Sequence, residues 1–260
     1  MRIFRPAVLL LLVVLPLPTF AAPTRSAFGP GEHIAYQVRY LGITAGIADL
    51  TVGATMQRDG HDVWPIICVA KTTSVASIYR LNDRFISYWD AKQARNVGSD
   101  FFVDENGSRR KERYRYDRDA AKVFADKRKE GSEPTSRDYD IEATALDLAA
   151  AGYWLRNVPL VVGASHEKPI FTGSKQFVMH ATVEARESIV TPLGTVDVYR
   201  VSVTTDFKGS VATKGNIRVF YTADAKQLPI RAEAEFVIGS VVAEAVQYEQ
   251  GQVFTPGADQ

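Results

Sequence analysis

The sequence has a single cysteine among its 260 residues. One cysteine excludes an internal disulfide, so an exported form of this chain would depend on its hydrophobic core for stability. A chain of this length can bury enough apolar surface for that, and its composition, 46% hydrophobic and 23% charged, is typical of a globular protein. Cys68 lies in the apolar run Trp64–Ala70, where a cysteine acts as a small buried residue rather than as a nucleophile.

Excess charge and clustered histidines are also lacking. The formal net charge is +1 at pH 7, so the chain has no basic footprint of the kind that nucleic-acid-binding proteins carry. The four histidines are scattered and form no paired ligand motif, which argues against a metal site. There is no glycine-rich phosphate loop and no Gly-x-Ser-x-Gly elbow. We therefore predict no cofactor and identify no catalytic residue.

No apolar run is long enough to cross a membrane as a helix. The longest, Ala7–Pro18, has about twelve residues where a span needs about twenty. Two arginines precede it and the small-residue boundary Thr19–Ala21 comes after it, so we predict a cleaved export signal over residues 1–21 rather than a membrane anchor. Cys68 is far from this boundary, so we expect no lipid-modified cysteine. The predicted location is the periplasm or the medium.

Alternation of apolar and polar residues is what the sequence has in abundance. From Asn216 to Glu249 it continues through three segments, and only extended strands have a side-chain period of two. Similar segments recur from Ile34 to Thr205 between turn signals such as Asn106-Gly107. We predict a mainly β protein, a large curved antiparallel sheet or open barrel of about eleven or twelve strands. It should form a single domain over residues 28–250, followed by a polar tail over 251–260.

One segment has the helical period instead. Ile141–Arg156 places apolar residues on one face, Asp138 or Asp140 can cap its start, and Pro159 prevents the helix from continuing. We predict that this single helix packs across the sheet as a plug or lid.

The end of this helix supplies candidate ligand contacts. Tyr153, Trp154 and Arg156, with Tyr36 and Tyr40 of the first strand, could line the mouth of a pocket between helix and sheet. The alternative is that the rings fill the core and that Arg156 pairs with a carboxylate. Small residues on the predicted inner wall leave room for the helix or for an apolar ligand. They are Ala48, Ala54, Ala181, Ala185, Ala232, Ala234, Ala243 and Ala245.

A cationic segment, Arg109–Arg118, is a second candidate site. We predict that Arg110, Arg113 and Arg115 form an interaction patch for a protein partner, for anionic lipid headgroups or for acidic polysaccharide. The alternative is a solvated hairpin face whose interleaved tyrosines turn inward. The next stretch, Lys127–Arg137, is polar and predicts a flexible loop.

Two carboxylates, Asp83 and Asp90, flank the aromatic residues Phe85, Tyr88 and Trp89. A pair of carboxylates beside aromatic rings is the composition of many sugar-cleaving sites. The alternative is that both are ordinary carboxylates at turns and strand ends.

Several turn motifs, taken in order, resemble the bacterial domain-of-unknown-function family numbered 3108. They are Gly31-Glu32 with Tyr36, Gly42 and Gly46, Leu155-Arg156 with Gly163, Thr191-Pro192-Leu193-Gly194, and Asp224 with Leu228-Pro229-Ile230-Arg231. The resemblance spans about Gly31 to Tyr248 and implies an exported, β-rich envelope protein of uncharacterised role, with no catalytic residues to transfer. In architecture alone, the predicted fold also resembles periplasmic lipoprotein carriers, whose unclosed barrel holds acyl chains beneath a helical lid.

These observations favour a periplasmic, non-enzymatic protein that binds or carries a hydrophobic, acyl-bearing ligand of the envelope. One alternative is a protein-interaction or assembly factor in envelope biogenesis that uses the cationic segment or an open sheet edge. Another is a glycan-active enzyme that uses Asp83 and Asp90.

Overall fold

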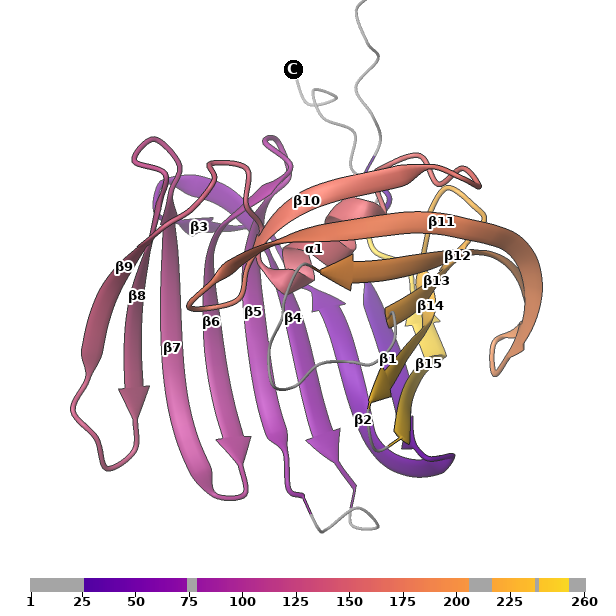
Figure 1. The fold of residues 1–260 in the computed structure, drawn as a ribbon, viewed down its shortest axis with the longest axis horizontal. Coiled ribbons are helices and arrows are strands. Elements are labelled where there is room, and N and C mark those ends of the chain that lie inside the picture. The colour runs from indigo at the N-terminus through magenta and orange to yellow at the C-terminus, as the bar shows by residue number, and fades with distance from the viewer. Residues whose placement is uncertain (1–25, 74–78, 206–216, 237–238, 253–260) are drawn as a thin grey trace, which may run out of the picture.

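A computed structural model describes residues 26–73, 79–205, 217–236 and 239–252. The predicted export signal over 1–21 lies outside the described residues, as does most of the predicted polar tail. Within the described residues the chain forms fifteen strands and one helix (Figure 1).

The strands take up most of the described chain. The first seven are β1 (His33–Tyr40), β2 (Ile43–Val52), β3 (Met56–Arg58), β4 (His61–Thr72), β5 (Asn82–Asp90), β6 (Arg95–Glu105) and β7 (Ser108–Asp117). The next four are β8 (Lys122–Lys129), β9 (Thr135–Asp140), β10 (Ser165–Phe171) and β11 (Gln176–Thr191), with helix α1 (Leu148–Leu155) between β9 and β10. The last four are β12 (Gly194–Thr205), β13 (Ile217–Thr222), β14 (Pro229–Phe236) and β15 (Gly239–Glu249).

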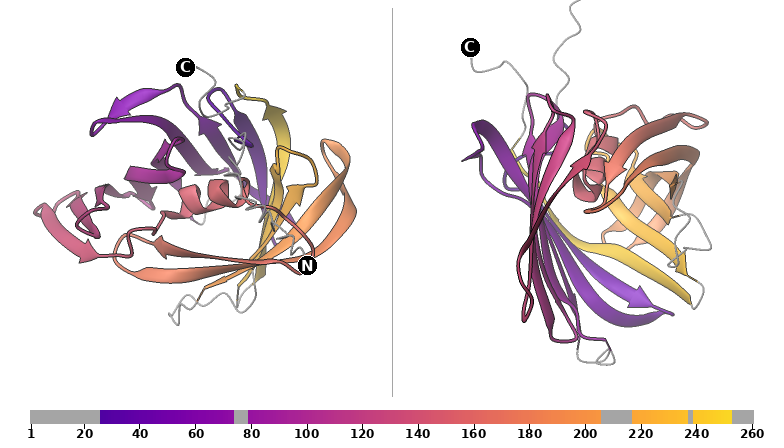
Figure 2. Two further views of the ribbon diagram at one scale, coloured as in Figure 1. Left: turned by 90° about the horizontal axis from the view of Figure 1, so that it is seen from above. Right: turned by 60° about the vertical axis from the view of Figure 1, so that its left-hand side comes forward.

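All strands join one antiparallel sheet in the order β10-β11-β12-β13-β14-β15-β1-β2-β4-β5-β6-β7-β8-β9, with β3 paired to β4. The sheet curls so that β4–β9 form one wall and β10–β13 face it, while β14, β15, β1 and β2 join the two (Figures 1 and 2). The pairing leaves β9 and β10 as the two edges, so the sheet does not close into a barrel. The predicted large antiparallel sheet with one helix is therefore confirmed, although fifteen strands exceed the eleven or twelve predicted.

The predicted loop over Lys127–Arg137 is wrong. β8 continues to Lys129 and β9 begins at Thr135, so only a short turn separates them. The segment has almost no apolar residues because most of its side chains are exposed to water, and this removed the alternation on which the prediction relied. Its strands are held by the backbone ladder and by cross-strand charge pairs such as Lys122 with Asp138.

The helix is half as long as predicted. The segment before it is not helical, since residues 143–144 form a turn and Leu146 forms a parallel bridge to Ile170 of β10, and α1 begins only after that bridge. The cap is Asp147, whose side chain accepts a hydrogen bond from the backbone N–H of Ala150, and not Asp138 or Asp140. The apolar spacing over 141–147 therefore reflects burial of Ile141, Ala145 and Leu146 in a non-helical segment rather than a helical face.

The main core lies where α1 sits between the two walls (Figure 2). Ala150, Ala151, Tyr153 and Leu155 of the helix are buried there. The inner face of the sheet is built from register rows that cross many strands. One row consists of Val201, Val219, Ala232, Ala243, Val38 and Gly46. Because its middle members are small, the helix and the sheet do not fill all the space between them.

Candidate functional site: an apolar cavity beneath the helix

A cavity of about 310 Å³ lies between α1 and the strands that join the two walls. Its larger lining residues are Tyr36, Leu50, Leu148, Tyr153, Val219, Tyr221 and Pro229. Its smaller ones are Ala48, Cys68, Ala149, Gly152, Ala232 and Ala243. Of the described residues that line it, none carries a charge. The cavity is therefore suited to an apolar ligand and not to an ion.

The cavity exists because three of the four neighbouring strands β14, β15, β1 and β2 carry alanine on the inner face. Ala232 of β14 pairs with Ala243 of β15, and Ala48 of β2 pairs with Tyr36 of β1. On the opposite side Gly152 puts no side chain between α1 and the sheet. Larger residues at these places would fill the space, so the cavity results directly from the choice of alanine and glycine.

Two tyrosine hydroxyls in the lining have different surroundings. The Tyr36 hydroxyl donates to the carbonyl oxygen of Pro229 at 2.6 Å. The Tyr153 hydroxyl has no hydrogen-bond partner within the described part of the chain, although Tyr153 is only 3% exposed. A buried hydroxyl without a partner is costly, so this group would be stabilised by any polar atom brought beside it.

Cys68 contributes an uncharged side chain to the lining of the cavity. Burial raises the pKa of its thiol to about 12, with a smaller contribution from the Asp147 carboxylate. The thiol therefore stays protonated near neutral pH and acts as a small apolar group rather than as a nucleophile, as the sequence predicted.

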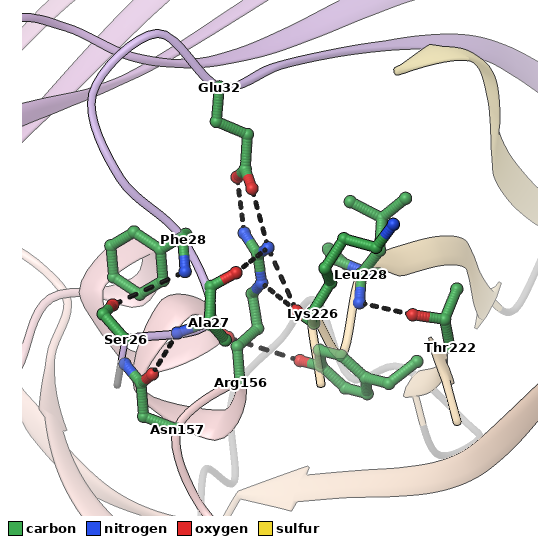
Figure 3. A network of polar contacts seen from close by, with 12 residues as sticks. Ser26, Ala27, Phe28, Glu32, Arg156, Asn157, Thr222, Lys226 and Leu228 are labelled. Atoms are coloured by element: carbon green, nitrogen blue, oxygen red, sulfur yellow. Dashed lines mark hydrogen bonds and ion pairs between the residues drawn. The ribbon is translucent and has the colours of Figure 1, made fainter. Parts of the chain in front are cut away.

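The end of α1 is fixed by a buried ion pair next to the cavity (Figure 3). The Arg156 guanidinium donates to both oxygens of the Glu32 carboxylate, at 2.5 and 2.8 Å. Both side chains are almost fully buried, Arg156 at 0% and Glu32 at 1% exposure. Burial alone would lower the pKa of Arg156, but the hydrogen bonds and charge of Glu32 raise it above its usual value, so the guanidinium remains charged.

The same guanidinium ties two other segments to the helix. It donates to the carbonyl oxygen of Ala27 at 3.2 Å and to that of Lys226, in the β13–β14 turn, at 3.1 Å (Figure 3). The Phe28 ring lies 5.2 Å from its Cζ atom and packs edge-on against Tyr153. Arg156 thus connects the segment before β1, the β13–β14 turn and the ring of a cavity residue.

The start of α1 is held by a second polar cluster. The Asp147 carboxylate accepts hydrogen bonds from Ser87 Oγ at 2.7 Å and from Asn96 Nδ2 at 2.8 Å, in addition to the Ala150 N–H. Burial raises the pKa of Asp147 to about 6, and its hydrogen bonds and the Arg118 charge only partly oppose this. With Asp147 at one end and Arg156 at the other, the roof of the cavity is fixed at both ends.

The raised pKa of Asp147 gives a pH dependence with a defined sign. Because the folded state binds this proton more tightly than the unfolded state, its contribution to stability is complete below about pH 4 and is lost as the pH rises through about 6. A shift of this size corresponds to about 2–3 kcal/mol. We expect Asp147→Asn, which can still cap the helix, to lack this loss of folding stability as the pH rises through about 6. Urea unfolding from pH 4 to 7.5 measures it, and parallel profiles for the two proteins would contradict the assignment.

The five predicted ligand residues lie in different places, and only two of them line the cavity. Tyr36 and Tyr153 both line the cavity. Arg156 makes the ion pair just described, as the alternative interpretation predicted. Trp154 is half-buried and faces β10, where Lys168 Nζ lies 5.2 Å from its ring centre. Tyr40 lies further along β1, paired with Val241.

The predicted patch of Arg110, Arg113 and Arg115 lies on β7, and each member has a partner. Arg110 pairs with Glu112 and Glu105, at 3.2 and 3.5 Å. Arg113 pairs with Asp100 at 3.3 Å, and the Arg115 guanidinium lies 4.4 Å from the centre of the Phe124 ring. The interleaved tyrosines, Tyr114 and Tyr116, are buried, as the alternative interpretation predicted.

The two carboxylates of the predicted sugar site do not converge. Asp83 and Asp90 lie near opposite ends of β5, and at about 3.3 Å per residue their Cα atoms are about 23 Å apart. Paired carboxylates of glycosidases lie within about 10 Å of each other. Asp83 accepts a hydrogen bond from the backbone N–H of Asp104, and Asp90 contacts His61. Both are therefore strand-end carboxylates, as the alternative interpretation held.

Sequence reasoning missed the residues that fix the helix, namely Glu32 as the partner of Arg156 and Asp147 as the cap. The signal for Asp147 was present, since it stands directly before an apolar run. Across the described ranges, no group of three or more His, Cys, Asp or Glu side chains is placed to hold a metal ion. No helix in the described chain has the length and apolar character needed to cross a membrane.

The described chain is thus an unclosed antiparallel sheet curled around one helix, a β-barrel-like fold. A solved structure of a β-barrel-like protein of the domain of unknown function DUF1849, from Brucella abortus, matches with a TM-score of 0.58. It is 8% identical, and the match covers 86% of this chain and 99% of that one. At this identity the likeness concerns the fold alone.

The chain belongs to the family of proteins of unknown function DUF3108, whose model matches residues 35–246. This confirms the resemblance predicted from the turn motifs. Two further solved structures match with lower TM-scores. A protein of Parabacteroides distasonis named as a candidate lipoprotein has a TM-score of 0.33 and 12% identity, over 86% of this chain and 99% of that one. A candidate exported protein of Bacteroides fragilis with a YmcC-like fold has a TM-score of 0.34 and 11% identity, over 88% and 100%. A search of curated proteins gave no match.

Proposed function

We propose that this protein is a periplasmic, non-enzymatic binding protein whose cavity beneath α1 holds a hydrophobic molecule of the cell envelope that carries an acyl chain. The observation that carries the proposal is the uncharged cavity of about 310 Å³, which is already formed without a ligand. Its size is at the lower end of the range for small-molecule sites. An acyl segment fits this combination of modest volume and apolar walls.

The Tyr153 hydroxyl supports a ligand with one polar end. Tyr153 lines the cavity and its buried hydroxyl has no partner among the described residues, so a carboxyl, ester or hydroxyl oxygen that reaches it on binding could satisfy it. Burial and the negative charge of Glu32 keep the pKa of Tyr153 well above its usual value, so the hydroxyl is protonated and can donate. A hydrocarbon chain ending in such an oxygen would use both the walls and this donor.

The proposal is tested by titrating the purified protein with a fatty acid that carries a fluorophore at one end. We expect saturable binding of one probe per chain and displacement by unlabelled fatty acids but not by a water-soluble acid such as acetate. Absence of saturable binding, or displacement by acetate as effective as by a long-chain acid, would contradict it.

Tyr153→Phe separates the polar contact from the apolar ones. Without a ligand, we expect this variant to be about 1 kcal/mol more stable, because a buried hydroxyl without a partner is removed. We expect it to bind the fatty acid about three- to tenfold more weakly, through loss of one hydrogen bond.

Tyr36→Phe is the matched control, because the hydroxyl it removes is already bonded to the Pro229 carbonyl. We expect it to lose about 1 kcal/mol of stability and to bind the fatty acid with little change. Equal effects of the two substitutions on stability would show that the two hydroxyls do not differ as described. Urea unfolding and the probe titration provide both readouts.

A further inference from the structure

A row of cations crosses the outer face of the sheet on β5–β8. Arg84 of β5 pairs with Phe102 of β6, Phe102 with Lys111 of β7, and Lys111 with Arg128 of β8. These four residues, the cationic row, are thus neighbours across four adjacent strands. Strands lie about 4.8 Å apart, so the Cα atoms of Lys111 and Arg128 are about 5 Å apart and those of Arg84 and Lys111 are about 10 Å apart.

The cationic row faces away from the helix. Phe101, next to Phe102, packs against the buried Tyr114 on the inner face, and successive side chains of a strand point to opposite faces. Arg84, Lys111 and Arg128 are all exposed. Phe102 is half-buried between two of them, with the Arg84 Cζ atom 4.3 Å and the Lys111 Nζ atom 5.8 Å from its ring centre. The ring therefore orients two of the three cations.

No carboxylate in the described chain forms an ion pair with any of the three cations, whereas the flanking rows are balanced. On one side Arg113 and Arg58 contact Asp100. On the other, Arg109 and Arg80 contact Asp104, at 3.2 and 3.7 Å. Three uncompensated charges of one sign in a single register row are an anion-binding feature that the charge count of the segment does not reveal.

Two surface hollows meet at this row. One of about 400 Å³ extends toward Pro134, Thr135 and Ser136, and the other, of about 430 Å³, extends toward Asn82 and Glu130. Both are lined by Phe102, Lys111 and Arg128. Each hollow also contains carboxylates, such as Asp126 in the first and Glu130 in the second.

We propose that this face binds an acidic oligosaccharide. The cations would pair with the acidic groups, while the carboxylates and hydroxyls of the two hollows would accept and donate hydrogen bonds to sugar hydroxyls. The carboxylates argue against an anionic bilayer as the ligand of this face. They would repel a continuous negative surface, whereas they can accept hydrogen bonds from sugar hydroxyls. The surface is separate from the cavity beneath α1, so this inference is independent of the proposed function.

The test compares two triple variants that remove the same charge, one from the cationic row and one from strands that line neither hollow. The row variant is Arg84→Gln with Lys111→Gln and Arg128→Gln. The control is Arg186→Gln with Arg200→Gln and Arg218→Gln on β11, β12 and β13, whose side chains are 56%, 33% and 38% exposed and belong to surface ion pairs. Exposed pairs of this kind add little stability, so both variants should fold, which circular dichroism checks.

The probe is tetragalacturonic acid, titrated by calorimetry at low salt, with maltotetraose as the neutral counterpart. We expect the row variant to bind tetragalacturonic acid at least about tenfold more weakly, the control less than about threefold more weakly, and maltotetraose not to bind. Equal losses in the two variants would overturn the proposal, because the effect would then be general charge. So would row-dependent binding of vesicles containing phosphatidylglycerol without binding of the oligosaccharide.

Discussion

Arg156→Met is expected to lower the free energy of unfolding by about 3–5 kcal/mol, the largest loss we expect from one substitution in this chain. The substitution leaves the Glu32 carboxylate charged, almost fully buried and without its partner. It also removes the hydrogen bonds to the carbonyls of Ala27 and Lys226, and so releases the segment before β1 and the β13–β14 turn. Urea unfolding at pH 7 measures the change.

Two controls separate the buried charge from the loss of any arginine. Arg200→Met removes a partly exposed arginine that pairs with Glu184 and Glu187, and we expect it to cost less than about 1 kcal/mol. The double variant Glu32→Leu with Arg156→Met removes both charges and should recover part of the loss. A loss below about 1 kcal/mol for Arg156→Met alone would contradict the role assigned to this ion pair.

Ala232→Phe is expected to reduce binding of the fatty-acid probe at least about tenfold. Ala232 lies on the inner face beside Ala243 and Val219, and all three line the cavity. A phenyl ring placed there would take up much of the 310 Å³ that the ligand needs. Because the ring fills space that is already empty, we expect stability to change by less than about 1.5 kcal/mol. The probe titration and urea unfolding measure the two effects.

Ala35→Phe is the matched control on the opposite face of the sheet. Ala35 is next to Tyr36 on β1, so its side chain points away from the cavity that Tyr36 lines. We expect binding within about twofold of the unsubstituted protein. If Ala232→Phe also bound the probe normally, the ligand would have to occupy another part of the molecule.

Much of the fold could be predicted from the sequence. Antiparallel strands with one solvent-exposed face show a clear alternation of apolar and polar residues, as in β13–β15. Prediction failed where a physical cause removed that pattern. β9 is exposed on almost every residue, so nothing distinguished it from a loop. The residues before α1 look helical in sequence, but Leu146 bridges to Ile170, a contact between distant segments that no local pattern contains, and the helix begins only at the next cap, Asp147.

The candidate site was predictable only in part. Tyr36 and Tyr153 could be chosen because aromatic residues stood on the first strand and at the end of the helix. The partner of Arg156 could not, because Glu32 is 124 residues away and one of many carboxylates. Predicting the cationic row would have required the register of four strands. Lys111 and Arg128 are 17 residues apart in sequence, and only strand pairing brings them together. Local patterns specify elements, and register specifies which side chains meet.

Ligand binding of the proposed kind depends on a preformed apolar cavity whose roof, α1, is fixed by Asp147 at one end and by Arg156 at the other. A fixed roof means that a ligand need not order the helix, which lowers the cost of binding. The smallness of Ala48, Ala232 and Ala243 then has a functional reason as well as a structural one.

The most direct test of this central claim is native mass spectrometry of the protein purified from its source cells without organic solvent, alongside the Ala232→Phe variant. We expect the unsubstituted protein to carry an added mass at close to one molecule per chain. Organic extraction should identify that molecule as a lipid with an acyl chain, and the variant should lack it. An unsubstituted protein with no added mass, or a variant that carries the same molecule to the same extent, would contradict the claim.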